Sequence, residues 1–337
     1  MSETIRLKDT DLKTTLGQDT DVIGLLIDVE EAETKQHNAY AKVTIIDKDV
    51  TLTAAIWDLN VVHLPTVKAA INRPVKLTGK PKVFGSGISY SVFKVQPLSD
   101  EELAEYGLTP DTFYNIIENR QELVEKLNNQ LNSISNTVYG KIAIKALQNN
   151  WDMFIHVAAG KSMHHAAVGG LLWHTTEVMS IADTFYQLSI DLGYDVLCRP
   201  LLIAGAVVHD IGKCRELSTS PIGATEYTAD SVLESHHMSG IAIVTEAATQ
   251  LDLQHTTECA ELCHVIAAHH ESKDWGQIKE AAMIEAVLVS KADHLSATLN
   301  ATARNIVHVK PGEQYTALGY NRSWVKSMGS FNNDMSI

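Results

Sequence analysis

Apolar and polar positions follow two different patterns along this chain, and the pattern changes near residue 100. In the first part, short runs rich in Val, Ile and Thr are separated by polar turns, which is typical of β-strands. From Phe113 onward, apolar residues recur at spacings of three and four, which is typical of amphipathic helices. The sequence therefore predicts a β-rich part followed by a helical part.

The first part predicts five short strands, with one short helix, Leu64–Ile71, between the third and the fourth. The strands are Asp21–Val29, Ala39–Ile46, Thr51–Trp57, Pro74–Lys80 and Ser89–Gln96. A turn at Phe84-Gly85-Ser86-Gly87 separates the last two strands. Five strands with a helix after the third follow the order of an OB-fold β-barrel.

The second part predicts an all-α domain. Its amphipathic runs are Ile116–Leu131, Leu171–Leu188, Leu201–Val208, Ile241–Leu253, Cys259–Ala268 and Ala281–Leu299. The preceding stretch, Pro97–Thr112, carries an acidic cluster and the turn residue Gly107, which favours a linker. We therefore expect a multidomain α and β protein, with an N-terminal OB-fold β-barrel over 1–98, a linker over 99–112, an all-α domain over 113–305 and an extended or partly disordered tail over 306–337.

Composition agrees with a soluble protein of this organisation. A length of 337 residues fits two domains, and contents of 45% hydrophobic and 20% charged residues are ordinary for globular chains. No apolar run is long enough for a transmembrane helix, and the polar N-terminus lacks the apolar core of a signal peptide. We therefore expect a cytoplasmic protein without a membrane partner. Its four cysteines are expected to be reduced and mostly buried.

The formal net charge of −14 is distributed unevenly. Residues 1–100 hold 12 Lys and Arg against 13 Asp and Glu, a balance of −1, whereas residues 101–337 hold 15 against 28, a balance of −13. An acidic surface repels nucleic acid, so the nearly neutral first part is the better candidate for binding it. A cation site in the second part would offset some of the acidity there.

Histidine and aspartate residues gather where helical runs begin or end. The sharpest example is His209-Asp210-Ile211-Gly212-Lys213, which follows the apolar run Leu201–Val208. A buried charge is costly unless it is paired or bound to a metal, and Gly212 would let the backbone turn beside it. Taken alone, the pair also fits a core histidine capped by a carboxylate. Further features in helical order favour a metal site: His174, His236, His269-His270 and Asp293.

This ordered series resembles the HD superfamily of metal-dependent phosphohydrolases. It is most similar to the YhaM-type 3′→5′ exoribonucleases, which place an OB-fold domain before an HD domain. The stretch Ala158–His165, which leads into Gly169–Thr175, carries the closer resemblance. Trp173 stands where that family usually has Glu, and Glu271 with Ser272 stands where it often has Gly. These departures affect substrate access and leave every expected ligand in place.

The resemblance implies two divalent metal ions. The first would be held by His174, His209, Asp210 and Asp293. The second would be held by Asp210, His236 and His269, with His270 close by, so that Asp210 bridges the two ions. The resemblance implies Mn²⁺ first, while nitrogen and oxygen ligands also suit Co²⁺, Fe²⁺ and Zn²⁺.

Residues around the two metal positions are assigned catalytic roles. Two metals close together can activate water and stabilise the leaving oxygen, with Asp210 between them. Lys213 and Lys161 would neutralise charge on the phosphoryl oxygens. His165, like its neighbour His164 and like His270, would orient the substrate or protonate the leaving group; each of these histidines also fits a purely structural hydrogen-bonding role.

The barrel is expected to bind single-stranded RNA or DNA, because OB-folds combine stacking aromatics with a basic groove. The candidate aromatics are Trp57, Phe84, Tyr90 and Phe93, and the candidate cations are Lys76, Lys80, Lys82 and Lys94. In the alternative interpretation, the aromatics fill the barrel and the lysines are solvated. For Trp57 we expect a core position.

The function expected from these features is metal-dependent 3′→5′ hydrolysis of single-stranded RNA, with DNA as a second substrate, to nucleoside 5′-monophosphates. One alternative is a nucleotide or cyclic-dinucleotide phosphohydrolase. Another is a di-iron enzyme that oxidises small molecules with O₂, and a third is a non-catalytic nucleic-acid adaptor. A homo-oligomer is compatible with each of these hypotheses.

Overall fold

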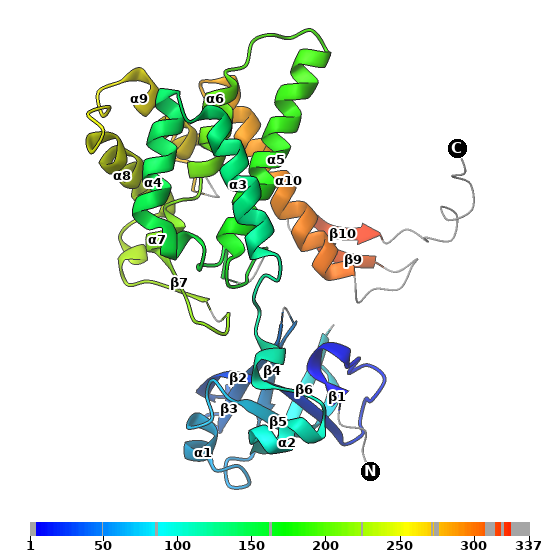
Figure 1. The fold of residues 1–337 in the computed structure, drawn as a ribbon. Helices are drawn as coiled ribbons and strands as arrows, with labels where there is room; N and C mark the ends of the chain where they lie inside the picture. Colours follow the sequence, from blue (N-terminus) through cyan, green and yellow to red (C-terminus); the bar gives the residue numbers. More distant parts are fainter. Residues whose placement is uncertain are drawn as a thin grey trace. The chain divides into compact units, whose positions relative to one another are not determined.

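The computed structural model describes residues 5–48, 50–84, 87–161, 164–223, 225–270, 272, 276–306, 314–317 and 320–324. The chain divides into two compact units. The first consists of Met1–Ile116 with Pro221–Ala224, and the second of Ile117–Ser220 with Thr225–Ile337. Figure 1 shows a barrel of strands in the first unit and packed helices in the second.

The first unit is a closed β-barrel with OB-fold topology. Its elements are β1 (Ile5–Arg6), η1 (Leu7–Asp9), β2 (Thr20–Glu33), β3 (Ala39–Asp47), β4 (Val50–Ile56), α1 (Leu64–Lys68), β5 (Pro74–Phe84) and β6 (Gly87–Pro97). The strand order is β1-β2-β3-β4-β6-β5, and the pairing of β5 with β2 closes the barrel. The five predicted strands and the helix after the third are confirmed.

Alternation along the strands separates the barrel core from its outer face. Ala41, Val43 and Ile45 of β3 are buried, while the residues between them are partly exposed. This period of two is what a pleated strand with one buried face requires. Tyr90 of β6 is completely buried, and its hydroxyl donates a hydrogen bond to the backbone carbonyl of Thr20 or Leu77.

The segment expected to be a linker instead folds onto the barrel. It forms α2 (Asp100–Glu105), which begins with a capping box between Ser99 and Glu102, and η2 (Pro110–Phe113). Leu103 and Phe113 are fully buried in a small apolar cluster that also contains residues of β2. The segment is ordered because it carries apolar side chains that cover one outer side of the barrel.

The second unit is a bundle of helices. It contains α3 (Arg120–Ile134), α4 (Val138–Phe154), α5 (Gly170–Asp191), α6 (Arg199–Val208), α7 (Lys213–Glu216), α8 (His236–Thr249), α9 (Thr257–Ala268) and α10 (Ile284–Ile306). The apolar helix α6 lies at its centre and packs against α3, α4, α5, α9 and α10. Beside these helices, β7 (Leu217–Thr219) and β8 (Thr225–Tyr227) form a short hairpin that we did not predict, followed by η3 (Asp230–Val232).

Helix α4 was also missing from the predicted runs. Its buried face combines the small residues Gly140, Ala143 and Ala146 with Ile142, Leu147 and Phe154. A Cβ at Gly140 would lie 2.1 Å from the carbonyl oxygen of Ile134. The small residue is therefore required by the close approach of α4 to the end of α3.

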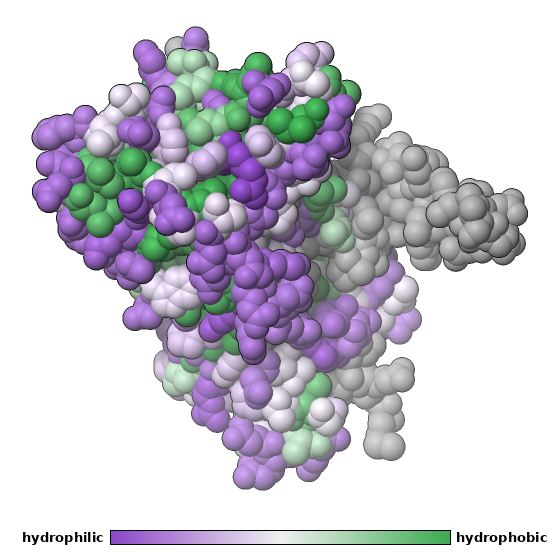
Figure 2. Space-filling model, turned by 45° about the horizontal axis from the view of Figure 1, so that its top comes forward, coloured by the Kyte–Doolittle hydropathy of each residue, from purple (hydrophilic) through white to green (hydrophobic). Residues whose placement is uncertain are grey.

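The last part of the expected tail is described only over β9 (Gln314–Ala317) and β10 (Tyr320–Trp324), which pair antiparallel. Among the helices of the described residues, none has both the length and the hydropathy needed to cross a membrane. Figure 2 shows that hydrophilic residues cover much of the face in view and that hydrophobic residues gather there in separate patches.

Replacing Tyr90 by Phe is expected to destabilise the barrel by about 1 kcal/mol, because the hydroxyl bonds to buried carbonyls are lost. Hydrogen exchange of the β2 and β5 amides should become roughly fivefold faster. The control is Phe93→Leu, which changes an aromatic residue with 41% exposure. Unchanged exchange in Tyr90→Phe would contradict a structural role for the hydroxyl.

Candidate metal centre

Five helices of the second unit bring imidazoles and carboxylates to one buried place. His174 lies in the second turn of α5, and His209 with Asp210 follows the end of α6. His236 begins α8, His269 follows the end of α9, and Asp293 lies within α10. Side chains from helix ends can meet here because α6 is central and its neighbours pack around it.

The first group of ligand atoms surrounds the Nε2 atom of His174. This atom lies 3.1 Å from Asp293 Oδ1, 3.4 Å from Asp210 Oδ2 and 3.3 Å from His209 Nε2. His174 and His209 are completely buried. Two imidazole nitrogens and two carboxylate oxygens thus converge, in the combination expected for the first metal.

The second group surrounds the other oxygen of Asp210. Its Oδ1 atom lies 3.7 Å from His236 Nε2 and 3.6 Å from His269 Nε2. All three atoms are buried, and none has a hydrogen-bond partner among the described residues. Buried polar atoms without partners are rare in proteins and require an explanation. A cation between these atoms would satisfy all three at once.

The opposite ring nitrogen of each histidine is held by a hydrogen bond. The Nδ1 atom of His209 contacts the Ala206 carbonyl at 2.8 Å, and that of His269 contacts the Ile266 carbonyl at 2.8 Å. A carbonyl can only accept, so Nδ1 carries the proton and Nε2 presents its lone pair inward. This arrangement is typical of metal-binding histidines.

Carboxylates hold the remaining two histidines. His236 Nδ1 lies 3.1 Å from Glu216 Oε2, at the end of α7. His174 Nδ1 lies 3.1 Å from the hydroxyl of Ser296, which donates a 2.8 Å bond to Glu177. Carboxylate contacts of this kind fix ring orientation and raise ligand basicity. Glu216, Glu177 and Ser296 were not identified from the sequence, because these three contacts join residues 20 or more positions apart.

The electrostatics of the group require a positive charge inside it. Burial alone lowers the pKa of His174, but hydrogen bonds to Asp210 and Asp293 raise it to about 9. Burial alone would raise the pKa of Asp210, yet Lys213 and His209 hold it well below its usual range. The Lys213 ammonium lies 2.6 Å from Asp210 Oδ2. Two buried carboxylates thus attract protons or other cations strongly.

Gly212 allows two helix starts to approach each other. A Cβ at this residue would lie 1.8 Å from the His236 carbonyl oxygen and 2.7 Å from the Gly240 nitrogen. Its φ angle of −62° is ordinary for any residue, so the expected need for a special backbone turn is wrong. What requires glycine is the contact that brings His236 close to Asp210.

These observations fit divalent metal ions. The ligand atoms are imidazole nitrogens and carboxylate oxygens, and the three buried atoms without partners face one another. His174, His209, Asp210 and Asp293 would hold one ion, and Asp210, His236 and His269 another. Nitrogen and oxygen donors of this kind suit Mn²⁺, Fe²⁺, Co²⁺ and Zn²⁺.

Two of the residues expected to assist catalysis lie beside this centre, and one does not. Lys213 contacts Asp210, and the ring centroid of His165 lies 5.0 Å from that of His174. His165 Nε2 also lies 3.0 Å from Glu177 Oε2. Lys161 instead pairs with Glu226 of β8, and its side chain is half exposed. Lys161 thus forms a surface ion pair, and its contact with phosphate stays a prediction.

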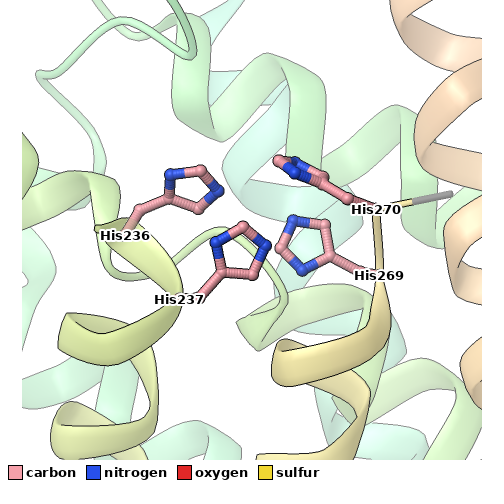
Figure 3. A group of neighbouring side chains, drawn as sticks. All are labelled: His236, His237, His269 and His270. Atoms are coloured by element: carbon pink, nitrogen blue, oxygen red, sulfur yellow. The ribbon is translucent and has the colours of Figure 1, made fainter. Parts of the chain in front are cut away.

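Paired histidines extend the second group. His236 and His237 come from the start of α8, and His269 and His270 come from the end of α9 (Figure 3). One ring nitrogen from each lies within 4.8 Å of the others. Burial and the neighbouring His236 lower the pKa of His237 to about 3, so its imidazole is neutral. His237 was missed in the sequence because His236 alone completed the expected series.

The barrel residues expected to bind nucleic acid divide into two sets. Trp57 is 52% exposed and stacks on Tyr40 with ring centroids 4.7 Å apart, so the expected core position is wrong. Phe93 is 41% exposed on the neighbouring strand β6. Tyr90 is completely buried and cannot stack on a base, because it fills the barrel. The side chain of Phe84 lies outside the described residues.

The exposed aromatics and the lysines share the outer face of the barrel. Ala55 of β4 pairs in parallel with Ser91 of β6, and each stands two residues before an exposed ring, Trp57 or Phe93, so the two rings belong to neighbouring segments of the barrel. Lys80 and Lys82 are exposed at alternate positions of β5, and Lys80 forms an ion pair with Asp19. Aromatic rings and ammonium groups are thus available together on one surface.

Residues 173–298 match the family model described as the HD domain. All residues of the expected metal set lie within this stretch. HD domains are typically metal-dependent phosphohydrolases, and the buried imidazole and carboxylate ligands agree with that chemistry. The chain therefore has an OB-fold barrel followed by a helical unit that contains an HD domain.

Several solved structures are similar to parts of the chain. The mitochondrial single-stranded DNA-binding protein of S. cerevisiae has 12% identity over 24% of this chain and 94% of that chain, with a TM-score of 0.19. The second OB-fold domain of replication protein A from Methanococcus maripaludis has 11% identity over 28% and 96%, with a TM-score of 0.21. An asparaginyl-tRNA synthetase from Entamoeba histolytica has 10% identity over 56% and 36%, with a TM-score of 0.24. These scores carry no conclusion, and the strand order itself defines the barrel.

Replacing Glu216 by Gln is expected to weaken metal binding roughly tenfold, because the negative charge behind His236 is lost. Competition with a fluorescent chelator measures this affinity. Glu246→Gln is the matched control, since Glu246 forms an exposed ion pair with Arg215. Equal metal affinity in the Glu216 and Glu246 variants would show that the Glu216–His236 contact does not support a ligand.

Proposed function

We propose that this protein is a metal-dependent phosphodiesterase that removes nucleotides from the 3′ end of single-stranded RNA, with single-stranded DNA as a second substrate. The observation that carries the hydrolytic part is the meeting of Asp210 Oδ1 with the unpaired Nε2 atoms of His236 and His269. The match of residues 173–298 to the HD domain supports a phosphohydrolase. The 3′→5′ direction rests on the resemblance to the YhaM-type exoribonucleases, which concerns the order of the two domains and the stretch before His174.

The chain's own residues supply binding and proton control around the reacting phosphate. Bound metal ions would activate water and neutralise charge on the phosphoryl group. Lys213 is already held in the centre by Asp210, so its ammonium can stabilise a phosphoryl oxygen there. His165 lies beside His174, with Nε2 held by Glu177 and Nδ1 3.3 Å from Nδ1 of His164, so this pair of histidines is the candidate proton donor to the leaving group.

The barrel would hold the strand that feeds this centre. Trp57, stacked on Tyr40, and Phe93 offer exposed ring faces, and Lys82 offers a cation for the phosphate backbone. Stacking on rings is tolerant of sequence because every base has a π-face. A processive or general nuclease needs this kind of recognition, whereas an enzyme for one small nucleotide does not.

Asp210→Asn is expected to lower hydrolysis of 5′-labelled single-stranded RNA by about three orders of magnitude or more, because the bridging carboxylate supports several kcal/mol of metal stabilisation. Gel analysis with and without Mn²⁺ measures the rate and the products. A ladder of shortened labelled RNAs supports attack from the 3′ end. The control is Asp183→Asn, which alters an ion pair with Arg199 outside the centre.

Two results in this assay would contradict the proposal. Full metal-dependent activity of Asp210→Asn would show that the assigned centre is wrong. Release of phosphate from mononucleotides without shortening of RNA would instead favour a nucleotide phosphohydrolase.

Replacing both Trp57 and Phe93 by Ala is expected to weaken binding of single-stranded RNA, by about 1–3 kcal/mol for each base that loses its ring. Fluorescence anisotropy in the Asp210→Asn background measures binding without cleavage. Tyr106→Ala is the control, since Tyr106 is a similarly exposed aromatic that follows α2 and lies outside the strands. Equal losses in the two variants would argue against a binding face on the strands.

A further inference from the structure

The two proposed metal positions differ in their surroundings. Around the first, two imidazoles meet the carboxylates of Asp210 and Asp293. Around the second, Asp210 Oδ1 meets the paired histidines of α8 and α9. The second position therefore has more nitrogen atoms within reach than the sequence-derived ligand set contains.

His237 is the residue that this ligand set omits. It is 1% exposed, and both its ring nitrogens are buried without a hydrogen-bond partner among the described residues. Among the described residues, nothing replaces the hydrogen bonds that this imidazole loses when it is removed from water. Packing alone would be served better by an apolar side chain of the same size.

Three histidine rings surround that of His237: the ring of His269 is stacked on it with the planes 22° apart, and the ring of His270 meets it edge-on at 88°. The centroid of the His237 ring lies 4.2 Å from that of His236, 4.6 Å from that of His269 and 4.5 Å from that of His270. Figure 3 shows the four rings facing a common space between the start of α8 and the end of α9. His236 Nε2 and His269 Nε2, the atoms near Asp210, are themselves without partners.

We propose that His237 is a ligand of the second metal position, which makes this position rich in imidazole and selective for a borderline divalent cation such as Zn²⁺ over Mn²⁺. Its donors would be Asp210, His236, His237, His269 and His270. Imidazole favours Zn²⁺, whereas carboxylate oxygens favour Mn²⁺. The inference rests on the metal centre of the proposed function and adds a ligand and a metal preference to it.

The unequal positions predict an order of filling. Zn²⁺ binds more tightly than Mn²⁺ at both positions, because affinities at nitrogen and oxygen ligands rise from Mn²⁺ toward the later divalent metals. The margin should be larger at the second position, which has more imidazole donors. One equivalent of Zn²⁺ added to the Mn²⁺-loaded protein should therefore displace Mn²⁺ from the second position first.

The test compares zinc binding by the metal-free full-length protein and by His237→Phe. Competition titration should show one tight zinc equivalent in the native chain, weakened roughly 10- to 100-fold or more by the substitution. In His237→Phe, the Mn²⁺ affinity of the first position should stay within about threefold of its value in the native chain, since that position does not include His237. His255→Phe is the matched control, because His255 is exposed.

A spectroscopic measurement gives an independent result. Co²⁺ in place of Zn²⁺ should show altered visible absorption bands in His237→Phe, because the number of nitrogen donors changes. If His237→Phe does not fold, His237→Gln, which keeps a polar side chain, replaces it in both measurements. Circular dichroism and thermal unfolding of the metal-free forms establish that each variant is folded.

Wild-type zinc affinity and an unchanged Co²⁺ spectrum in the folded variants would overturn the inference, and would leave the hydrolytic centre of Asp210, His236 and His269 standing. Conversely, zinc binding that depends on His237 in a protein without activity on RNA would support the inference and contradict the proposed function. The two proposals can therefore fail separately.

Discussion

The helical unit depends on one buried carboxylate. Asp210 is 2% exposed, and its two oxygens face different groups of side chains. Oδ2 contacts Lys213 and His174, while Oδ1 faces His236 and His269. A charge at such depth persists only when cations or strong donors surround it. Helices from distant parts of the chain supply these groups: α8 and α9 with residues at their ends, and α10 with Asp293 in its interior.

Neighbouring groups hold the four ligand histidines in place through hydrogen bonds. Backbone carbonyls hold His209 and His269, and carboxylates hold His236 directly and His174 through Ser296. Each contact occupies Nδ1 and leaves Nε2 for a cation. Gly212 contributes in another way, because its missing side chain lets α8 begin beside Asp210. Ring orientation and backbone packing together decide whether scattered histidines can act as one site.

The barrel and the helical unit place their functional side chains differently, the barrel on its surface and the helical unit in its interior. The barrel closes its strands around an apolar core and leaves Trp57 and Phe93 on its surface. The helical unit buries its polar chemistry, where a low dielectric strengthens every charge interaction. The acidic residues are concentrated outside the barrel sequence, so the barrel repels a nucleic-acid backbone less than the helical unit does.

The sequence by itself determined the barrel strands and most helices, because alternation and helical spacing are local properties of the chain. It also supplied the ligand types, since His and Asp at helix ends stand out from apolar runs. Only the tertiary structure decided that Trp57 is exposed and Tyr90 buried, that Lys161 pairs with Glu226, and that His237 joins the histidine group. Those outcomes depend on which elements pack together across long stretches of chain, and no short window of sequence contains that information.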